Sequence, residues 1–194
     1  MGQNFNHWER ADTDANKEVL LKRYRVAAQC VSGTVFDLAC GYGVGSSILA
    51  AQDSVDTVVG VDHDDQAVTF ARAMQIPKCE FNVADLDLWG PTTGVFIAGD
   101  CDWVVSFETI EHLATPKLFV DACKRIAQVG MCVSVPIVNT VGNNPHHRHN
   151  FKPGDMAQWF YDWHQVEQTF LTERVGKEYR VLYELSVFTK KGAA

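Results

Sequence analysis

A short apolar run that passes into a glycine-rich turn constrains the fold of this chain more than any other feature. The run covers residues 34–39, and Gly41, Gly43 and Gly45 follow it. An apolar run of this length, bounded by glycine, is typical of a buried strand. Glycine allows positive φ angles and close approach of a ligand, and ligands of open parallel sheets bind at such strand ends. The segment indicates a ligand-binding strand–turn–helix unit, although an ordinary tight turn would use the same glycines.

Strand-like and helix-like patterns alternate along most of the chain. They predict helices over 12–29, 46–52, 64–74 and 116–128, and strands over 34–39, 57–61, 79–83, 103–107 and 131–135, with a loop at 89–99. A polar stretch at 139–150 and a short helix at 153–161 then precede strands 165–172 and 179–189, which form a hairpin around 175–177. Repeated strand–helix units imply a parallel sheet with helices on both faces, and the hairpin adds antiparallel pairing at one edge.

The composition is that of an ordinary soluble domain. The 194 residues suit one domain, with 46% hydrophobic and 21% charged residues. No apolar run could span a bilayer, and the first residues lack the order of a signal peptide, so a cytoplasmic location is expected. A net charge of −7 disfavours tight binding to a long nucleic acid. Six cysteines without a C-x-x-C pair predict buried, reduced thiols.

Acidic residues stand at the ends of three strands of the predicted sheet. Asp37 lies in the first apolar run, Asp62 ends the second, and Asp85 follows the third. The position of Asp62 suits a carboxylate that accepts both hydroxyls of a ribose. A carboxylate at Asp85 can accept the exocyclic amine of adenine. Each acid alone could cap a helix or lie in a loop, but three in register are much less expected by chance.

These motifs together resemble the class I S-adenosylmethionine (SAM)-dependent methyltransferase family. The resemblance rests on VFDLACGYGVG, VVGVD, NVADL, CDWVVSFETIEHL and MCVSVP, and it covers most of the chain. It implies a Rossmann-like α/β fold with a seven-stranded, mostly parallel sheet and a C-terminal antiparallel hairpin. One domain over 1–194 is expected, with an N-terminal lid and helix (1–30), a SAM-binding core (31–136), and an acceptor-side loop and hairpin (137–194). Ala39 stands where the family often has glycine, and alanine is small enough to fit.

The resemblance implies SAM across the carboxyl edge of the sheet. The residues expected to contact it are Asp37, Ala39, Gly41, Tyr42 and Gly43 around the methionine part, Asp62 and His63 near the ribose, Asp85 and Leu86 at the adenine, and Phe107. A nicotinamide dehydrogenase is the alternative for such a turn. Its G-x-G-x-x-G fingerprint would need a glycine where Ser46 stands, and no second catalytic domain follows.

The acceptor side is expected just past the fourth strand, where Glu108, Glu111 and His112 form a Glu-x-x-Glu-His motif. A helical turn would place the three on one face. Together with a later histidine they could bind a divalent cation, Mg²⁺ through oxygen or Mn²⁺ with better tolerance of imidazole. In many metal-free relatives the same letters cap a helix or line the pocket.

A second polar cluster, residues 143–151, follows the fifth strand and contains the candidate His147, with His149 as its alternate. Either histidine could complete a cation site or act as a general base. The combination resembles small-RNA 3′-terminal 2′-O-methyltransferases and ubiquinone-pathway O-methyltransferases. The NP-x-H-x-x-x-F spacing is similar to small-molecule and sugar methyltransferases.

The function expected from these residues is methyl transfer to a small molecule, at a hydroxyl, by a monomer or homodimer. The expected catalytic residues are His147, Glu108 and His112, and the expected cation ligands are Glu108, Glu111, His112 and His147. A metal-assisted methyltransferase of RNA 3′ ends, with a terminal nucleotide as acceptor, and a non-catalytic SAM-binding module are the alternatives.

Aromatic residues outside these motifs have two interpretations each. Phe5, His7 and Trp8 could form a lid over the pocket or pack on the sheet edge. Trp159, Tyr161 and Trp163 could line the acceptor wall or belong to the core.

Overall fold

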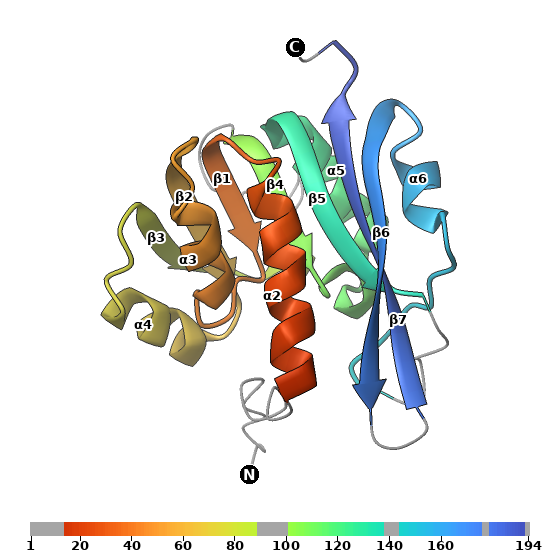
Figure 1. Ribbon diagram of the computed structural model, residues 1–194, viewed down its shortest axis with the longest axis horizontal. Helices are drawn as coiled ribbons and strands as arrows, with labels where there is room; N and C mark the ends of the chain where they lie inside the picture. The colour runs from red at the N-terminus through yellow and green to blue at the C-terminus, as the bar shows by residue number, and fades with distance from the viewer. Residues whose placement is uncertain (1–13, 89–100, 138–143, 176–178, 193–194) are drawn as a thin grey trace.

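The computed structural model describes residues 14–88, 101–137, 144–175 and 179–192 (Figure 1). Its sheet contains seven strands, in the order β3-β2-β1-β4-β5-β7-β6. The strands are β1 (Gly33–Leu38), β2 (Val55–Asp62), β3 (Cys79–Val83), β4 (Cys101–Phe107), β5 (Ala127–Pro136), β6 (Trp163–Val175) and β7 (Tyr179–Lys190). Strands β1 to β5 run parallel, and β7 pairs antiparallel with both β5 and β6. The seven-stranded sheet with a C-terminal antiparallel hairpin is thereby confirmed.

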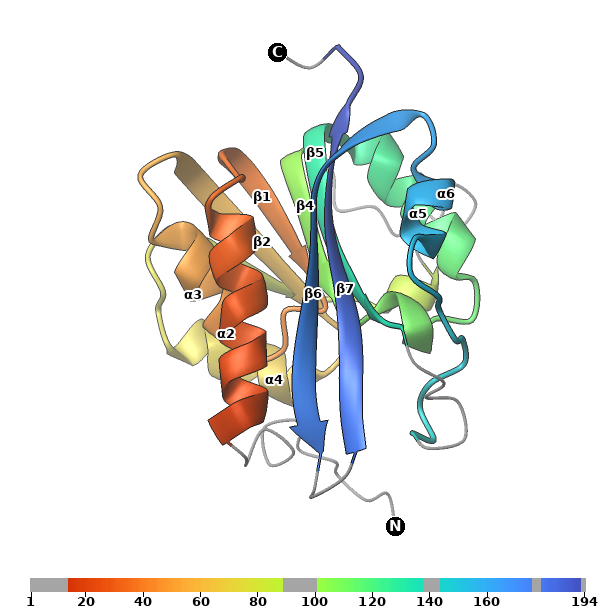
Figure 2. The same cartoon turned by 45° about the vertical axis from the view of Figure 1, so that its right-hand side comes forward.

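Helices cover both faces of this sheet, as expected (Figure 2). They are α2 (Asp14–Ala28), α3 (Val44–Ala50), α4 (Asp65–Ala73), α5 (Pro116–Ile126) and α6 (Asp155–Trp159), with single 3₁₀ turns η1 (Leu86–Leu88) and η2 (Ile110–His112). In both views α2, α3 and α4 lie on one face, and α5 and α6 lie on the other. The helix expected over 116–128 ends at Ile126, because Ala127 already belongs to β5.

Two apolar layers hold the sheet between its helices. Alternate residues of a strand point to opposite faces, so neighbours in β1 and β4 join different layers. One layer contains Phe36 and Val104 with Phe119 of α5, and the other contains Val35 and Val105. Because both faces are covered, the central strands read as continuous apolar runs rather than as alternating patterns.

The structure bears on two expectations from composition, one about the cysteines and one about membrane-spanning segments. All six cysteines lie in the described ranges and none forms a disulfide. Four are buried as expected, whereas Cys30 and Cys79 are only partly buried. Burial raises the pKa of the Cys123 and Cys132 thiols well above the ordinary value. Of the helices that the structure describes, none is long and apolar enough to cross a membrane.

The strand order places the candidate site. The chain moves from β1 outward to β2 and β3, then returns past β1 to β4 and β5. Such a reversal opens a crevice at the carboxyl ends of the two central strands, where α/β proteins bind ligands. The glycine turn after β1, Asp62 at the end of β2, Asp85 after β3 and Glu108 after β4 all stand at this edge.

Candidate active site

The turn after β1 combines a left-handed backbone with one open position. Ala39, Gly41 and Gly43 have φ angles of 68°, 53° and 78°. The positive φ explains why glycine would suit position 39. A Cβ built at Gly41 meets no atom within 4 Å, whereas one at Gly43 lies 2.8 Å from the Phe81 ring. Gly41 is therefore the glycine of the turn that borders space for a ligand.

Asp62 is joined directly to this turn. Its Oδ2 accepts a hydrogen bond from the Gly41 N–H at 2.8 Å, and its Oδ1 accepts one from the Asp64 N–H at 3.0 Å. His63 Nδ1 lies 3.2 Å from the same Oδ1. Burial raises the pKa of Asp62, but these three hydrogen bonds outweigh it and leave the pKa below the ordinary value. The carboxylate is ionised at neutral pH, as an acceptor for ribose hydroxyls must be.

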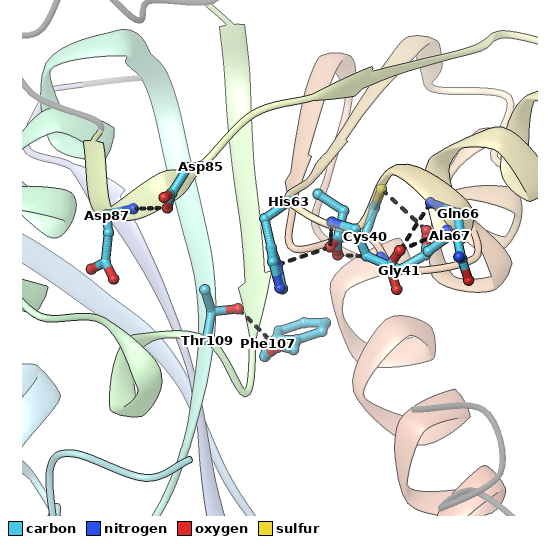
Figure 3. Close-up of polar contacts among 11 residues, drawn as sticks. Cys40, Gly41, His63, Gln66, Ala67, Asp85, Asp87, Phe107 and Thr109 are labelled. Carbon is cyan, nitrogen blue, oxygen red and sulfur yellow. Dashed lines mark hydrogen bonds and ion pairs between the residues drawn. The ribbon is translucent and has the colours of Figure 1, made fainter. Parts of the chain in front are cut away.

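The expected adenine end lies beyond β3. Asp85 is exposed, and its Oδ1 accepts a hydrogen bond of 2.9 Å from the Asp87 N–H. The side chain of His63 projects from the end of β2 towards Phe107 (Figure 3). The hydrogen bond to Asp62 raises the pKa of His63, and nearby acids including Asp85 add to this. His63 can therefore carry a positive charge beside two carboxylates.

Three of the residues expected to contact the cofactor pack mainly against the protein. Leu86 is buried in the core layer that contains Val61. The Phe107 ring is buried and meets Tyr24 edge-on with ring centroids 5.0 Å apart. The ring of partly buried Tyr42 contacts Phe70 at 5.4 Å. The side chains of Leu86 and Phe107 thus belong to the packing of the core, and their expected contact with the cofactor stays a prediction.

Asp37 supports the turn from behind rather than facing a ligand. It has no exposed surface, and its oxygens accept hydrogen bonds from Tyr24 Oη at 3.0 Å and Ser46 Oγ at 2.6 Å. Burial raises its pKa to about 6. These two hydrogen bonds give Asp37 a supporting role in the turn, and its expected contact with the methionine part stays a prediction. Tyr24 and Ser46 were not among the expected site residues.

Glu108 begins the acceptor side with a left-handed backbone, φ 52°. Its N–H donates to the Ser134 carbonyl at 3.2 Å, and its Oε1 accepts from the Ser134 hydroxyl at 2.8 Å. The same Oε1 lies 3.5 Å from Nη2 of Arg23, a buried residue of α2. The sequence does not single out Arg23 as a site residue, because a basic residue beside Lys22 and Arg25 is typical of a solvent-exposed helix face.

A compact group of potential metal ligands lies next to Glu108. One ligand atom each from Glu111, His112 and His147 falls within 4.8 Å of the others. Glu111 is fully buried, and neither of its oxygens has a hydrogen-bond partner among the described residues. Burial, followed by the charge of Glu108, raises the pKa of Glu111 well above its usual range. This group contains three of the four expected cation ligands; the fourth, Glu108, contacts Ser134 and Arg23 instead.

Backbone hydrogen bonds fix the two histidines of this group. His112 Nδ1 donates to the His146 carbonyl at 3.0 Å, and its Nε2 lies 3.8 Å from Glu111 Oε1. The rings of His112 and His147 meet edge-on at 4.7 Å. The alternate, His149, donates from Nε2 to the Leu113 carbonyl at 2.8 Å and is thereby occupied. The structure thus favours His147 over His149.

The aromatic residues considered for the acceptor wall differ in their burial. Trp163 is buried against Phe160, and Trp159 packs edge-on against Phe151, so these rings belong to the core. Tyr161 is 78% exposed. Phe5, His7 and Trp8, the expected loop at 89–99 and Asn143 lie outside the described residues.

Comparison with known proteins gives concordant matches. A family model described as a methyltransferase domain matches residues 36–133. A probable S-adenosylmethionine-dependent methyltransferase of Mycolicibacterium smegmatis is 32% identical over 143 residues, which are 72% of this chain and 49% of that protein. Trans-aconitate 2-methyltransferase of Delftia acidovorans is 30% identical over 91 residues, 44% of this chain and 32% of that protein. The N-methyltransferase NodS of Bradyrhizobium japonicum, in complex with S-adenosylhomocysteine (SAH), superposes with a TM-score of 0.75 at 13% identity, covering 96% of this chain and 93% of that chain.

The family match and the geometry agree. The matched segment takes in the glycine turn, Asp62, Asp85, Glu108 and Glu111, the residues that the fold gathers at one edge. The chain spans about half the length of the mycobacterial relative. The chain belongs to the class I S-adenosylmethionine-dependent methyltransferase family.

Proposed function

We propose that this chain transfers a methyl group from SAM to a hydroxyl of a small molecule. The observation that carries the proposal is the ionised Asp62, hydrogen-bonded to the Gly41 N–H where the turn borders open space. Asp62 would accept the ribose hydroxyls, Asp85 the adenine amine, and the backbone around Gly41 would face the methionine part. When bound, SAM supplies an activated methyl group on a sulfonium.

The acceptor would lie over the ends of β4 and β5. A hydroxyl acceptor must lose its proton, and a neutral imidazole nitrogen is suited to accept it. His147 would take this role, with its turn fixed by the hydrogen bond from its N–H to the Asn144 carbonyl. Glu108, locked by Ser134, would position the acceptor, and His112 would orient His147 through their ring contact.

As the alternative to a general base, we propose a divalent cation at Glu111, His112 and His147, which would take up the ring nitrogen of His147. The buried carboxyl of Glu111 is the feature that a cation would satisfy, because its two oxygens have no hydrogen-bond partner among the described residues and a buried polar group without one is costly. Two imidazoles and one carboxylate suit Mn²⁺ better than Mg²⁺, which prefers an all-oxygen set. A cation there would act as a Lewis acid on the acceptor oxygen.

Isothermal calorimetry tests the cofactor part. The wild-type protein should bind SAH, and Asp62→Asn should bind it at least tenfold more weakly, since charge-assisted hydrogen bonds to the ribose are lost. Asp56→Asn, an exposed position of the same strand, is the matched control and should bind normally. Absence of SAH binding to folded wild-type protein would contradict the proposal.

A radiolabelled-methyl screen then identifies the acceptor. The names of the similar proteins differ, one stating trans-aconitate and another N-methylation, so the panel should cover hydroxyl, carboxyl and amine acceptors. A metal-assisted RNA 3′-end activity would appear as chelator-sensitive labelling of RNA ends. A non-catalytic module would bind SAH and label no acceptor. Sedimentation would separate the proposed monomer from a homodimer.

A further inference from the structure

Arg23 of α2 is a buried cation with few hydrogen-bond partners among the described residues. Its side chain is 7% exposed, and its recorded partners are the Glu108 carboxylate, 3.5 Å away, and the Tyr183 ring, 4.2 Å below its Cζ. Nε of Arg23 is buried and has no hydrogen-bond partner among the described residues. A guanidinium offers five N–H donors, and one contact at 3.5 Å is longer than a normal hydrogen bond. The side chain is therefore poorly satisfied as it stands.

Several features preorganise this guanidinium. Tyr183 belongs to β7 and pairs with Pro136 at the end of β5, and the centre of its ring lies 4.2 Å from Cζ of Arg23. Ser134 donates a 2.8 Å hydrogen bond to the same Oε1 of Glu108 that lies 3.5 Å from Arg23 Nη2, so the arginine shares this oxygen with the serine. A planar fork held by an aromatic face is suited to bind a carboxylate through two parallel hydrogen bonds.

The neighbouring residue of the same helix shows which half of the site Arg23 serves. Tyr24 reaches the end of β1, where it bonds Asp37 behind the cofactor turn. Arg23 instead reaches Glu108, just past β4, on the side assigned to the acceptor. Two adjacent side chains of α2 thus contact the two parts of the proposed site: Tyr24 contacts Asp37 behind the cofactor turn, and Arg23 contacts Glu108 on the proposed acceptor side.

We propose that Arg23 is the residue that recognises a carboxylate on the methyl acceptor, so that the acceptor class is small organic acids. The inference rests on the proposed methyltransferase function and specifies its substrate class. Electrostatics agree: Glu108 neutralises Arg23 in the empty site, and the positive sulfonium of a bound donor leaves room for one more negative charge. Glu108 would repel an incoming carboxylate and so sets an upper limit on its affinity.

Side-chain NMR of the arginine Nε–H groups tests the inference without knowledge of the true acceptor. The full chain is titrated with malonate, and with malonamide as a probe of the same shape without charge, each with and without SAH. We expect a saturable shift of the Arg23 Nε–H with malonate alone, strengthened by SAH. Equal responses to both probes, or no response to malonate, would overturn the inference even in protein that binds SAH. Failure of SAH binding in the same samples would instead count against the proposed function.

Variants separate a binding role from a merely structural one. Arg23→Lys keeps the charge but loses the fork and should weaken malonate binding about tenfold. Glu108→Gln should strengthen it severalfold, because the competing negative charge is removed. Arg25→Lys, on the exposed side of the same helix, is the matched control and should change nothing. Unchanged affinity in Arg23→Lys would refute the proposal, and the wild-type comparison of the two probes stays decisive should a variant fail to fold.

Discussion

The hydroxyl of Tyr24 donates a 3.0 Å hydrogen bond to Oδ1 of Asp37, and both side chains are buried. Ser46 donates to the other oxygen of the same carboxylate. The first helix of the described chain is thereby tied to the end of β1 and to the start of α3. The glycine turn lies between these two attachment points, so buried hydrogen bonds behind it help to fix its shape.

Gly45→Ala should be strongly destabilising, because a Cβ there would overlap the Tyr24 ring. Overpacking of this kind costs about 1–3 kcal/mol. Urea denaturation measures the loss. Gly41→Ala provides the contrast: it meets no atom within 4 Å but carries a φ of 53°, so its cost of about 1–2 kcal/mol comes from the backbone alone. Equal stability of Gly45→Ala and wild type would show that the ring is not confined there.

Asp37 should make the protein less stable as the pH rises. Its folded pKa of about 6 exceeds the ordinary 3.8, so the folded protein keeps a proton that the unfolded chain has released. The stability that this group contributes is present at low pH and is lost as the pH rises from about 4 through about 6. Asp37→Asn lacks this term, so its unfolding free energy should improve relative to wild type between pH 5 and pH 7. Parallel pH profiles of the two proteins would contradict the assignment.

Glu111→Gln should have opposite effects on metal binding and on metal-free stability. Removing the carboxylate should weaken Mn²⁺ binding, followed by electron paramagnetic resonance, by at least about tenfold. Without metal, burial disfavours the ionised form of Glu111, as its raised pKa shows, and an amide carries no charge, so stability at neutral pH should rise. Glu80→Gln on the exposed side of β3 is the control and should alter neither quantity. If Mn²⁺ binds Glu111→Gln as tightly as wild type, the cation site is wrong.

Replacing His147 should affect activity and metal binding, whereas replacing His149 should affect stability. His147→Ala should reduce Mn²⁺ affinity and methyl transfer while changing the unfolding free energy little. His149→Ala removes the hydrogen bond to the Leu113 carbonyl and should cost about 1 kcal/mol, with Mn²⁺ affinity retained. Calorimetry and denaturation on both variants measure the two effects. The reverse pattern would assign the active histidine to position 149.

Local patterns predict the fold here because every strand of the sheet has a clear signal. The run at 34–39 and its glycines specify β1 and its turn, and the two C-terminal strands were expected where β6 and β7 lie. Boundaries differ where two elements abut: the helix expected to reach residue 128 yields to β5 at Ala127, whose side chain is buried in the core. Periodicity alone cannot decide which element takes such residues.

The candidate site was predicted less completely, because burial depends on contacts between distant parts of the chain. Asp37 looks like a ligand-facing acid until Tyr24 and Ser46 occupy both of its oxygens. Arg23 looks solvated until Tyr183, far along the chain, covers it. Glu108 fits a metal motif by spacing, but the serine at position 134 draws it aside. None of these partners has a fixed spacing that sequence reasoning could use.

The main-chain carbonyl of Glu111 receives the N–H groups of both Arg148 and His149, at 2.8 and 3.2 Å. This attachment uses backbone atoms alone, whereas the side chain of Arg148 adds an ion pair to Asp87 at 3.4 Å. The side chains at 146 and 147 can therefore change while the main chain of the turn stays anchored to the 3₁₀ turn that carries Glu111.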